Sequence, residues 1–414
     1  MSEWERVKLS KLCQRITVGY VGAMAKEYEK EGVPLLRSLN IKPYVIDFNN
    51  IKYISKTFHE RIVKSKIEEG DVLVVRTGVP GTSCVVPNGV KELNCSDLVI
   101  ITTDRNKLNP YFLSFYFNSI AKNYVFSQKV GAIQQHFNIG SAKEMEIYLP
   151  PIGEQNKIAD VINSLNEKID INNRINQELE AMARLIYDYW FVQFDFPISK
   201  ALAAQLGNPA LEGKPYKTSG GPMTYNHTLK REIPEGWGVE KITNFAAIKA
   251  GGDKPKNISE IKTEEFSVPI FSNGISNEGL YGYTTKPVIN RPSITITARG
   301  TIGYGFMRTI PFFPIIRLIV MTPNNSNLIE YLYEYCKRVE FDVSGSVQRQ
   351  LTVPQVSNMK IMIPSEDISW HYSKLNSPIT LKKQLIKEQN QKLTELRDWL
   401  LPMLMNGQVT VGGN

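Results

Sequence analysis

The chain has 414 residues, of which 42% are hydrophobic and 22% are charged. This composition is that of an ordinary globular protein and excludes a disordered chain, and the length predicts two or more domains. Lys and Arg outnumber Asp and Glu by 49 to 41, a formal net charge of +8 that makes a polyanionic partner such as nucleic acid a reasonable hypothesis.

The sequence carries no sign of export or of membrane insertion. No run of about 18 apolar residues occurs, and the opening MSEWERVKLSKL lacks an apolar signal core. We therefore expect a soluble cytoplasmic protein. The cysteines are far apart and show no C-x-x-C spacing, so we expect them to be reduced and structural: Cys13, Cys84, Cys95 and Cys336.

Residues 1–150 predict a small α+β domain. Short β-rich runs alternate with turn signals, at 33–36, 70–75 and 97–102. Asn109 and Pro110 then open an aromatic-rich run that predicts a helix, because proline is tolerated in the first turn of a helix.

Residues 151–192 predict one long helix, since no proline occurs between Pro151 and Pro197. Its apolar residues follow the three-and-four spacing of a coiled-coil seam: Ile158, Ile162, Leu165, Ile169, Ile175, Leu179, Met182, Ile186 and Tyr189. Asn172 and Asn176 continue the first register, and asparagines at such positions fix the register and the number of partner helices. An ordinary core helix with a solvated middle is the alternative.

Turn-forming residues between 193 and 232 predict a connector, after which the sequence repeats. In the clearest match, residues 345–364 repeat residues 131–150 without a gap, at an offset of 214 positions. The repeat predicts a second small domain at 233–365 and a second long helix with a tail at 366–414, the helix itself lying near 372–405 after an irregular start at 366–378.

The seam of the second helix contains Ile379, Ile386, Leu393, Leu396, Leu400 and Met403. It also has a polar interruption, at Gln389 and Asn390. Two such helices could pair antiparallel with their polar patches opposed, which would leave one small domain at each end.

This order of elements resembles the specificity (S) subunit of type I restriction-modification systems over nearly the whole chain. The motifs that carry the resemblance are LPPIGEQ at 149–155, YWF at 189–191, IPEGW at 233–237 and LLPMLMNG at 400–407. The second helix departs from the pattern, because no proline-glutamate-glutamine run opens it.

The resemblance implies an α+β fold in which two target-recognition domains are separated by two long antiparallel coiled-coil helices. Each domain would read one half of a split double-stranded DNA target, and the helices would fix the gap and dock two modification (methyltransferase) subunits, which restriction subunits join. The chain would be a non-catalytic bacterial or archaeal protein without a cofactor of its own. S-adenosylmethionine, Mg²⁺ and ATP would bind the partner subunits.

A catalytic site is not evident from the residues. The P-loop, G-x-S-x-G and H-E-x-x-H motifs are absent, and the four histidines have no metal-ligand spacing, so we expect no metal site. Asp253, Glu260 and Lys262 form one nuclease-like fragment, for which a solvated loop is the simpler interpretation. A stand-alone DNA-modifying enzyme and a coiled-coil scaffold that does not read DNA remain the alternatives.

Candidate DNA-reading residues occur in pairs related by the repeat. Arg matches the guanine edge, and Gln or Asn matches the adenine edge. Our main candidates are Gln134, Gln135 and His136 in the first domain and Gln348, Arg349 and Gln350 in the second. For these residues a polar turn is the alternative.

Further candidates lie after strands. Arg76 and Thr77 belong to one glycine loop and Arg299 to the other, where backbone amides can approach a phosphate. The remaining candidates are Arg37, Ser38, Ser272, Asn273, Lys254 and Lys256. Plain hairpin turns and surface lysines would look the same. Because the two sets of residues differ, we expect two different half-targets and hence an asymmetric full target.

Overall fold

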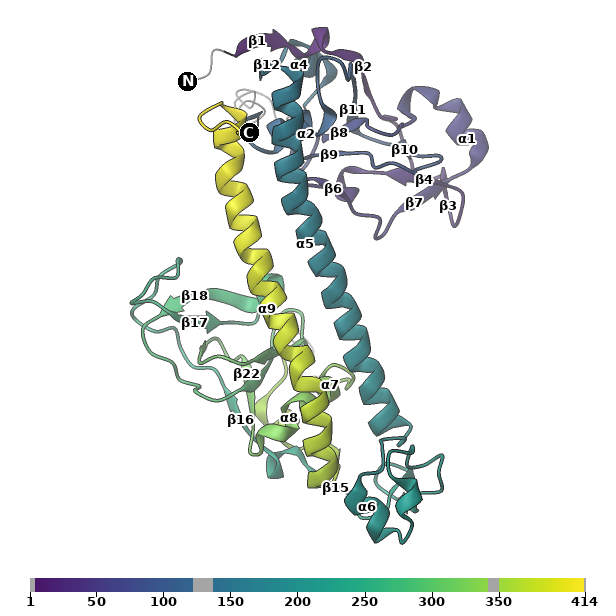
Figure 1. Ribbon diagram of the computed structural model, residues 1–414, viewed down its shortest axis with the longest axis vertical. Coiled ribbons are helices and arrows are strands. Elements are labelled where there is room, and N and C mark those ends of the chain that lie inside the picture. The colour runs from purple at the N-terminus through teal and green to yellow at the C-terminus, as the bar shows by residue number, and fades with distance from the viewer. Residues whose placement is uncertain (1–3, 122–136, 342–349, 413–414) are drawn as a thin grey trace. The chain divides into compact units, whose positions relative to one another are not determined.

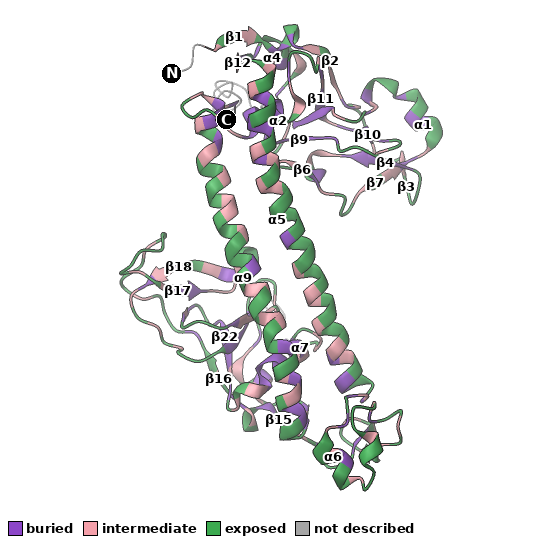
Figure 2. Cartoon of the chain, in the orientation of Figure 1, coloured by how far each residue is buried: buried purple, intermediate pink, exposed green. Residues whose placement is uncertain are grey.

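The computed structural model describes residues 4–121, 137–341 and 350–412. Figure 1 shows its two long helices and its groups of short strands. Buried residues concentrate in the strands and in the short helices packed beside them, whereas much of each long helix is exposed (Figure 2). Within the described residues, no helix is long and apolar enough to cross a membrane.

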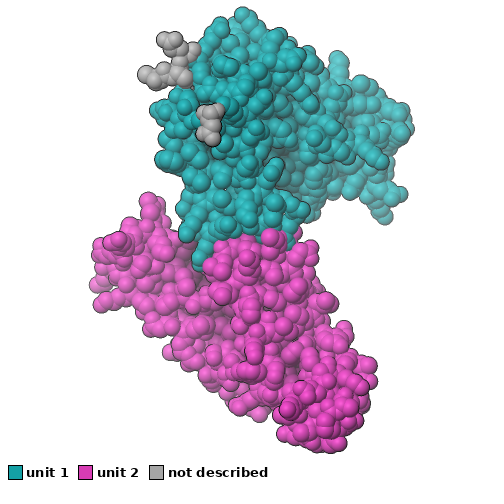
Figure 3. Space-filling model, viewed as in Figure 1, with its two compact units in different colours: residues 1–174, 387–414 teal, residues 175–386 magenta. Residues whose placement is uncertain are grey.

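The chain divides into two compact units (Figure 3). Each unit contains a part of both long helices. Unit 1 comprises residues 1–174 and 387–414, and unit 2 comprises residues 175–386. Unit 1 thus joins two segments that are distant in the sequence, whereas unit 2 is one continuous segment.

The strands of unit 1 form two sheets of four strands, ordered β2-β11-β8-β9 and β10-β4-β7-β3, and the two-stranded pairs β1-β12 and β5-β6. Their bounds are β1 (Glu5–Lys8), β2 (Cys13–Val18), β3 (Tyr28–Glu29), β4 (Val33–Leu36), β5 (Ile41–Lys42), β6 (Val45–Ile46), β7 (Lys52–Ile54), β8 (Val72–Val75), β9 (Ser83–Val85), β10 (Asn94–Cys95), β11 (Leu98–Thr103) and β12 (Glu146–Leu149). The short helices are α1 (Lys56–Arg61), α2 (Pro110–Asn118) and α4 (Ile139–Glu144). The three predicted β runs and the aromatic helix are confirmed, and the side chain of Asn109 caps α2.

Unit 2 has one sheet ordered β16-β22-β19-β20, one ordered β18-β17-β21, and the pairs β13-β14 and β15-β23. The strands are β13 (Met223–Asn226), β14 (Arg231–Pro234), β15 (Gly238–Lys241), β16 (Ala246–Ala250), β17 (Val268–Phe271), β18 (Leu280–Thr284), β19 (Ser293–Ile296), β20 (Gly305–Arg308), β21 (Phe313–Pro314), β22 (Ile319–Pro323) and β23 (Lys360–Ile363). The short helices are α6 (Lys200–Gln205), α7 (Ile329–Cys336) and α8 (Val353–Ser357).

The sheet topology of unit 1 recurs in unit 2. The four-stranded order β2-β11-β8-β9 corresponds to β16-β22-β19-β20, and β1-β12 corresponds to β15-β23. In both units a strand that begins with Val-Pro has a parallel neighbour, β10 beside β4 and β21 beside β17. The repeat in the sequence is therefore a repeat of topology.

The long helices are α5 (Ile152–Tyr187), which continues as a π-helical segment (Asp188–Val192), and α9 (Glu366–Met405). The irregular start that we expected at 366–378 is wrong, because α9 is continuous through Pro378. Ile368 and Tyr372 of this first part are buried in the core of unit 2. The free energy gained by burying these two side chains offsets the loss of the backbone hydrogen bond that Pro378 cannot donate.

The segment 193–232, which we predicted to be a connector, contains α6, β13 and the start of β14. Aromatic side chains hold this segment to the rest of unit 2. The ring of Phe196 stacks on that of Tyr216 within the segment, with 4.7 Å between the centroids, and on that of Trp237 outside it, with 5.4 Å between the centroids. The many turn-forming residues hide this packing in the sequence, because the buried aromatics are too sparse to give a periodic pattern.

Candidate nucleic-acid interface

The first glycine loop, residues 76–81, joins β8 to β9 in unit 1. Gly78 and Gly81 have φ of 84° and 88°, which side chains with a Cβ rarely adopt. Val75 donates its N–H to the carbonyl of Thr82 at 2.8 Å, and Gly81 donates to the carbonyl of Val75 at 3.0 Å. These bonds make a tight turn directly after a fully buried strand.

The second glycine loop, between β19 and β20, has the same hydrogen bonds in unit 2. Thr297 donates its N–H to the carbonyl of Tyr304 at 3.0 Å, and Gly303 donates to the carbonyl of Thr297 at 2.9 Å. Gly300 and Gly303 have φ of 71° and 88°. With these glycines aligned, Arg76 corresponds to Ala298, and Thr77 corresponds to Arg299.

The residue that follows each set of main candidates is hydrogen-bonded to one of these two loops. Phe137 donates its N–H to the carbonyl of Arg76 at 3.3 Å, and Leu351 donates to the carbonyl of Ala298 at 2.9 Å. Gln134, Gln135, His136, Gln348 and Arg349 themselves lie outside the described residues. Gln350 is described, and its side-chain oxygen accepts from the guanidinium of Arg299 at 3.3 Å.

The cation of the first loop is already paired. The guanidinium of Arg76 donates to Asp97 Oδ1 at 3.0 Å, and the hydroxyl of Thr77 donates to Asp97 Oδ2 at 2.7 Å. The Arg76 side chain is only 16% exposed. The sequence pattern did not single out Asp97, because only the fold brings it from the start of β11 to the glycine loop.

The candidates after the matching strands, Arg37 and Ser38 in unit 1 and Ser272 and Asn273 in unit 2, lie at turns, where three of them hydrogen-bond to backbone groups. Arg37 donates its guanidinium to the carbonyl of Asn50 at 2.8 Å, and Ser38 begins a short 3-10 turn. In unit 2 the N–H of Ser272 donates to the carbonyl of Gly279 at 2.8 Å. Asn273 Oδ1 accepts from the N–H of Ala298 at 2.7 Å, and its Nδ2 donates to the carbonyl of Ile316. The amide of Asn273 therefore joins the second glycine loop to the turn before β22.

Lys254 and Lys256 lie in an exposed loop between β16 and β17. The ammonium of Lys254 donates to the hydroxyl of Tyr281 and lies 4.3 Å from the centre of its ring. Asp253, Glu260 and Lys262 of the nuclease-like fragment are exposed in the same loop. Within the described ranges, no cluster of His, Cys, Asp and Glu has the geometry to hold a metal ion.

A polar layer lies between the parts of α5 and α9 that belong to unit 1. Asn172 is 2% exposed, and its side-chain amide donates to Gln389 Oε1 at 2.9 Å and to Asn390 Oδ1 at 2.7 Å. Asn390 in turn donates to Asn173 Oδ1 at 2.9 Å. The polar interruptions of the two helices thus meet. Asn176 belongs to unit 2, and its Oδ1 is buried without a hydrogen-bond partner among the described residues.

The predicted seam is only partly buried. Ile158, Ile162 and Ile386 are buried, but Ile175, Met182, Tyr189 and Leu396 are exposed. The sequence assigned these four to the seam because their spacing is helical. The structure instead continues the first register through Asn172 and Asn176, so the exposed residues form a second apolar stripe.

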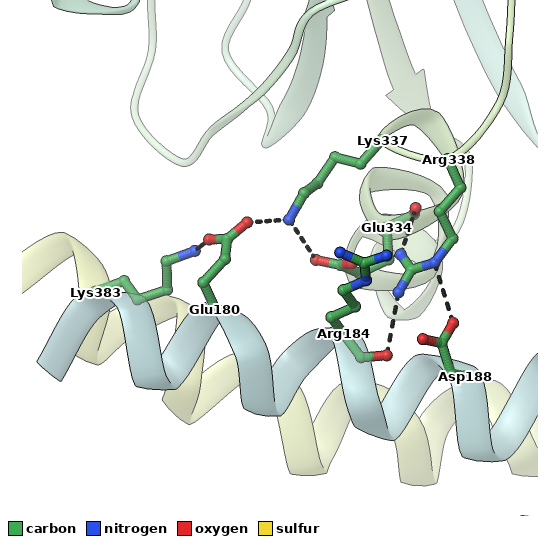
Figure 4. Close-up of polar contacts among 7 residues, drawn as sticks. All are labelled: Glu180, Arg184, Asp188, Glu334, Lys337, Arg338 and Lys383. Atoms are coloured by element: carbon green, nitrogen blue, oxygen red, sulfur yellow. Dashed lines mark hydrogen bonds and ion pairs between the residues drawn. The ribbon is translucent and has the colours of Figure 1, made fainter. Parts of the chain in front are cut away.

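In unit 2, ion pairs hold the end of α7 to α5, and α5 to α9 (Figure 4). Glu180 of α5 accepts from both Lys337 and Lys383. Arg338, just after α7, contacts Glu334 at 2.6 Å and Asp188 at 3.2 Å, and it also donates to the carbonyl of Arg184 at 3.1 Å.

In unit 1 a neutral amide attaches the start of α5 to the segment before α2. Gln155 at the start of α5 is fully buried, and its Nε2 donates to the carbonyls of Lys107 and Pro150, each at 2.9 Å. Its Oε1 accepts from the N–H of Asn109 at 2.9 Å. This is the glutamine of the LPPIGEQ motif, and its bonds explain why that residue opens the first helix.

A repeated fold with paired glycine loops, attached to two long helices, can be compared with known proteins. The family model described as the type I restriction modification DNA specificity domain matches residues 1–181 and 234–395, well over half of the chain. The chain belongs to this family. It is therefore a specificity subunit and not itself an enzyme.

Known relatives carry the same description. The specificity subunit of the type I restriction enzyme HindI from Haemophilus influenzae is 25% identical over 410 residues, covering 84% of this chain and 88% of the relative. The specificity subunit of the enzyme MjaIX from Methanocaldococcus jannaschii is also 25% identical, covering 88% of this chain and 85% of the relative. The fold resembles the crystal structure of the S subunit of a type I restriction-modification system from M. genitalium, with a TM-score of 0.60, 16% identity, and coverage of 97% of this chain and 96% of that one.

Proposed function

We propose that the chain gives a type I restriction-modification complex its DNA specificity by reading a split target with two recognition domains. The observation that carries the proposal is the repeated site. In each unit a glycine loop follows a buried strand, and the residue after the polar candidates, Phe137 or Leu351, donates its N–H to the carbonyl of the residue after that strand or one position later, Arg76 or Ala298. Backbone amides at such loops can approach phosphates, while Gln and Arg read base edges. Each domain reads one half of the target.

The two half-targets differ, and the full target is asymmetric. The second loop exposes Arg299 beside Gln350, whereas the first has Thr77 at the position of Arg299 and commits Arg76 to Asp97. Different side chains at equivalent places present different hydrogen-bonding patterns to the bases. A palindromic target would contradict this proposal.

The long helices form an antiparallel coiled coil that sets the gap between the half-targets. The contact of Asn172 with Gln389 and Asn390, and the contact of Asn166 with Arg397 at 2.9 Å, support antiparallel pairing in unit 1. A polar layer around the buried Asn172 favours one register over its alternatives, because a shifted register leaves that amide unpaired. A fixed register is what a spacer needs.

Two methyltransferase subunits dock on the exposed faces of these helices. Three exposed apolar positions recur at the offset of 214 residues, pairing Ile171 with Leu385, Met182 with Leu396, and Leu185 with Trp399. Unit 1 contains Ile171, Leu396 and Trp399, and unit 2 contains the other three, so each unit offers the same set. A repeated apolar surface fits two copies of one partner.

The partners supply the chemistry. The methyltransferase subunits bind S-adenosylmethionine, and restriction subunits that join them use ATP and Mg²⁺, while this chain needs no cofactor. The complex works on cytoplasmic DNA. A scaffold that joins proteins without reading DNA is the second candidate, and the exposed apolar helix faces are the observation that favours it.

The test is a genome-wide map of methylated adenines in a host that carries the matching methyltransferase subunit, with and without this chain. A new asymmetric split motif that depends on the chain is the expected result. If the two proteins associate and no motif appears, the scaffold function replaces the reading function.

A second form of the chain tests the spacer. Duplicating residues 171–177 together with 385–391 lengthens each helix by about 10 Å and keeps every side chain of the polar layer. We expect a longer gap between two unchanged half-targets. An unchanged gap would contradict the role of the helices as a spacer.

A further inference from the structure

The residue before strand β11 in unit 1 and the residue two positions before β22 in unit 2 occupy equivalent places. Val99 pairs with Val18 and Val74, and Ile319 pairs with Ala250 and Ile296, so β11 and β22 hold the same register with their neighbours. The preceding residues agree, because Leu98 accepts from the N–H of Gly19 at 2.8 Å and Leu318 accepts from that of Gly251 at 2.7 Å. Position 97 therefore corresponds to position 317.

The charge at this position is reversed between the units. Unit 1 has Asp97, which accepts from both Arg76 and Thr77 and so neutralises the cation of its glycine loop. Unit 2 has Arg317, which is exposed and has no ion-pair partner among the described residues. In unit 1 the glycine loop and position 97 together thus carry no net charge. In unit 2 the glycine loop and position 317 carry two exposed cations, Arg299 and Arg317.

The fold holds the two arginine segments of unit 2 together. Asn273 accepts from the N–H of Ala298, next to Arg299, and donates to the carbonyl of Ile316, next to Arg317. Both Ile316 and Arg317 have left-handed φ, of 53° and 62°. A β-branched residue in this conformation is strained, and such strain persists where the surrounding structure requires it.

We propose that Arg317 and Arg299 form a DNA-phosphate contact that is particular to the second recognition domain, and that Asp97 withholds the corresponding cation in the first. This rests on the proposed DNA-reading function and goes beyond it. The second half-target is held with more salt-dependent affinity, whereas the first depends more on contacts that carry no net charge. Each phosphate that a cation neutralises adds about 0.9 to the slope of log affinity against log salt.

The test measures this slope for the full-length chain, assembled with its methyltransferase subunits, on a duplex that carries the methylated motif. We expect Arg317→Gln and Arg299→Gln each to lower the slope by about 1. Arg317→Lys keeps the charge, so it should keep the slope. The matched control is Lys217→Gln, which removes an exposed cation from the segment between the long helix and the second domain and should leave the slope unchanged.

The reciprocal variant is Asp97→Asn, which retains a residue that tolerates left-handed φ, here 54°. It frees Arg76, so we expect the slope to rise by about 1, and Arg76→Gln in the same chain should cancel the rise.

The outcomes separate the two proposals. If the wild-type assembly does not prefer its motif over a scrambled duplex, the reading function and this inference both fail. If it prefers the motif but Arg317→Gln and Lys217→Gln have the same slope as the wild type, the inference fails alone. The same follows if Asp97→Asn leaves the slope unchanged while its thermal unfolding matches that of the wild type.

Discussion

The side-chain amide of Asn172, which is buried in unit 1, donates from α5 to Asn390 Oδ1 on α9 at 2.7 Å. The two residues are 218 positions apart, and each belongs to a polar interruption in an apolar helix pattern. Their contact joins the two halves of the repeat, since α5 follows the first domain and α9 follows the second.

Asn172→Ala should destabilise unit 1 by about 1–2 kcal/mol, because the two hydrogen bonds donated by the buried Asn172 amide are lost. Urea unfolding followed by circular dichroism measures the loss. The control is Gln177→Ala, which removes an exposed amide from the same helix. Equal stability of the two variants would mean that water satisfies the layer and that the amides do not fix the register.

The repeated apolar set on the helices predicts a change in stoichiometry. Leu185→Lys in unit 2 and Trp399→Lys in unit 1 each place a charge on one of the two surfaces, so each variant should bind one methyltransferase subunit instead of two. The double variant should bind none. Native mass spectrometry of the assembled complex counts the subunits.

The control for that experiment is Leu375→Lys. Leu375 is also an exposed apolar residue of α9, but the residue 214 positions before it, Val161, is only partly exposed. This variant should bind two subunits. Loss of both subunits from either single variant would show that the surfaces are not independent.

The sequence predicted the organisation of the chain better than its contacts. The repeat, the strands and the long first helix follow from local patterns, such as the matched glycines and the proline-free run after Pro151. The sequence did not predict the continuous start of α9, because Pro378 and the polar residues around it resemble the end of a helix. The helix is stabilised there by the burial of Tyr372 in the core of unit 2, which the local sequence does not show.

The candidate site shows the same limit. Arg76 and Arg299 were grouped because each lies in a glycine loop after a strand, yet the aligned turns put Arg299 at the position of Thr77. The role of Asp97 depends on a contact between residues 21 positions apart, and that of Asn273 on contacts 25 and 43 positions away. Such contacts follow from sheet topology, which local spacing does not contain.

Arg338 links α7 to α5, so its removal should loosen the packing of α7 on α5. Arg338→Met leaves Glu334, which is 5% exposed, with one cationic partner fewer, and we expect a loss of about 2 kcal/mol or more. The double variant with Glu334→Gln should lose less, since the buried side chain at 334 is then neutral and no longer lacks one of its two cations, Lys337 and Arg338. Amide hydrogen exchange of α7 measures both effects.

Removal of an exposed cation is the control for Arg338→Met and the double variant. Lys249→Met removes a charge from the exposed part of β16 and should leave the exchange of α7 unchanged. If Arg338→Met and the double variant lose the same stability, the ion pair with Glu334 contributes nothing, and the stacking of Arg338 on Tyr187, 4.2 Å from the ring centre, explains the loss.

His59 makes the stability of unit 1 depend on pH. Its ring is buried, its Nδ1 lies 3.1 Å from Asn94 Nδ2, and burial together with the nearby charge of Lys66 lowers its pKa below the usual 6.5. The unfolded chain then binds a proton more readily than the folded chain. Stability is therefore complete above the unfolded pKa, and it falls as the pH drops below 6.5 toward the folded pKa.

His59→Gln should remove this dependence while keeping a side chain that can hydrogen-bond to Asn94. We expect the melting temperature of the wild type to fall more than that of the variant between about pH 7.5 and about pH 5.5, the range in which histidine titrates. His227→Gln removes an exposed histidine from unit 2 and should melt as the wild type does at every pH. If His59→Gln and the wild type lose equal stability on acidification, carboxylates and not the buried imidazole control the acid response.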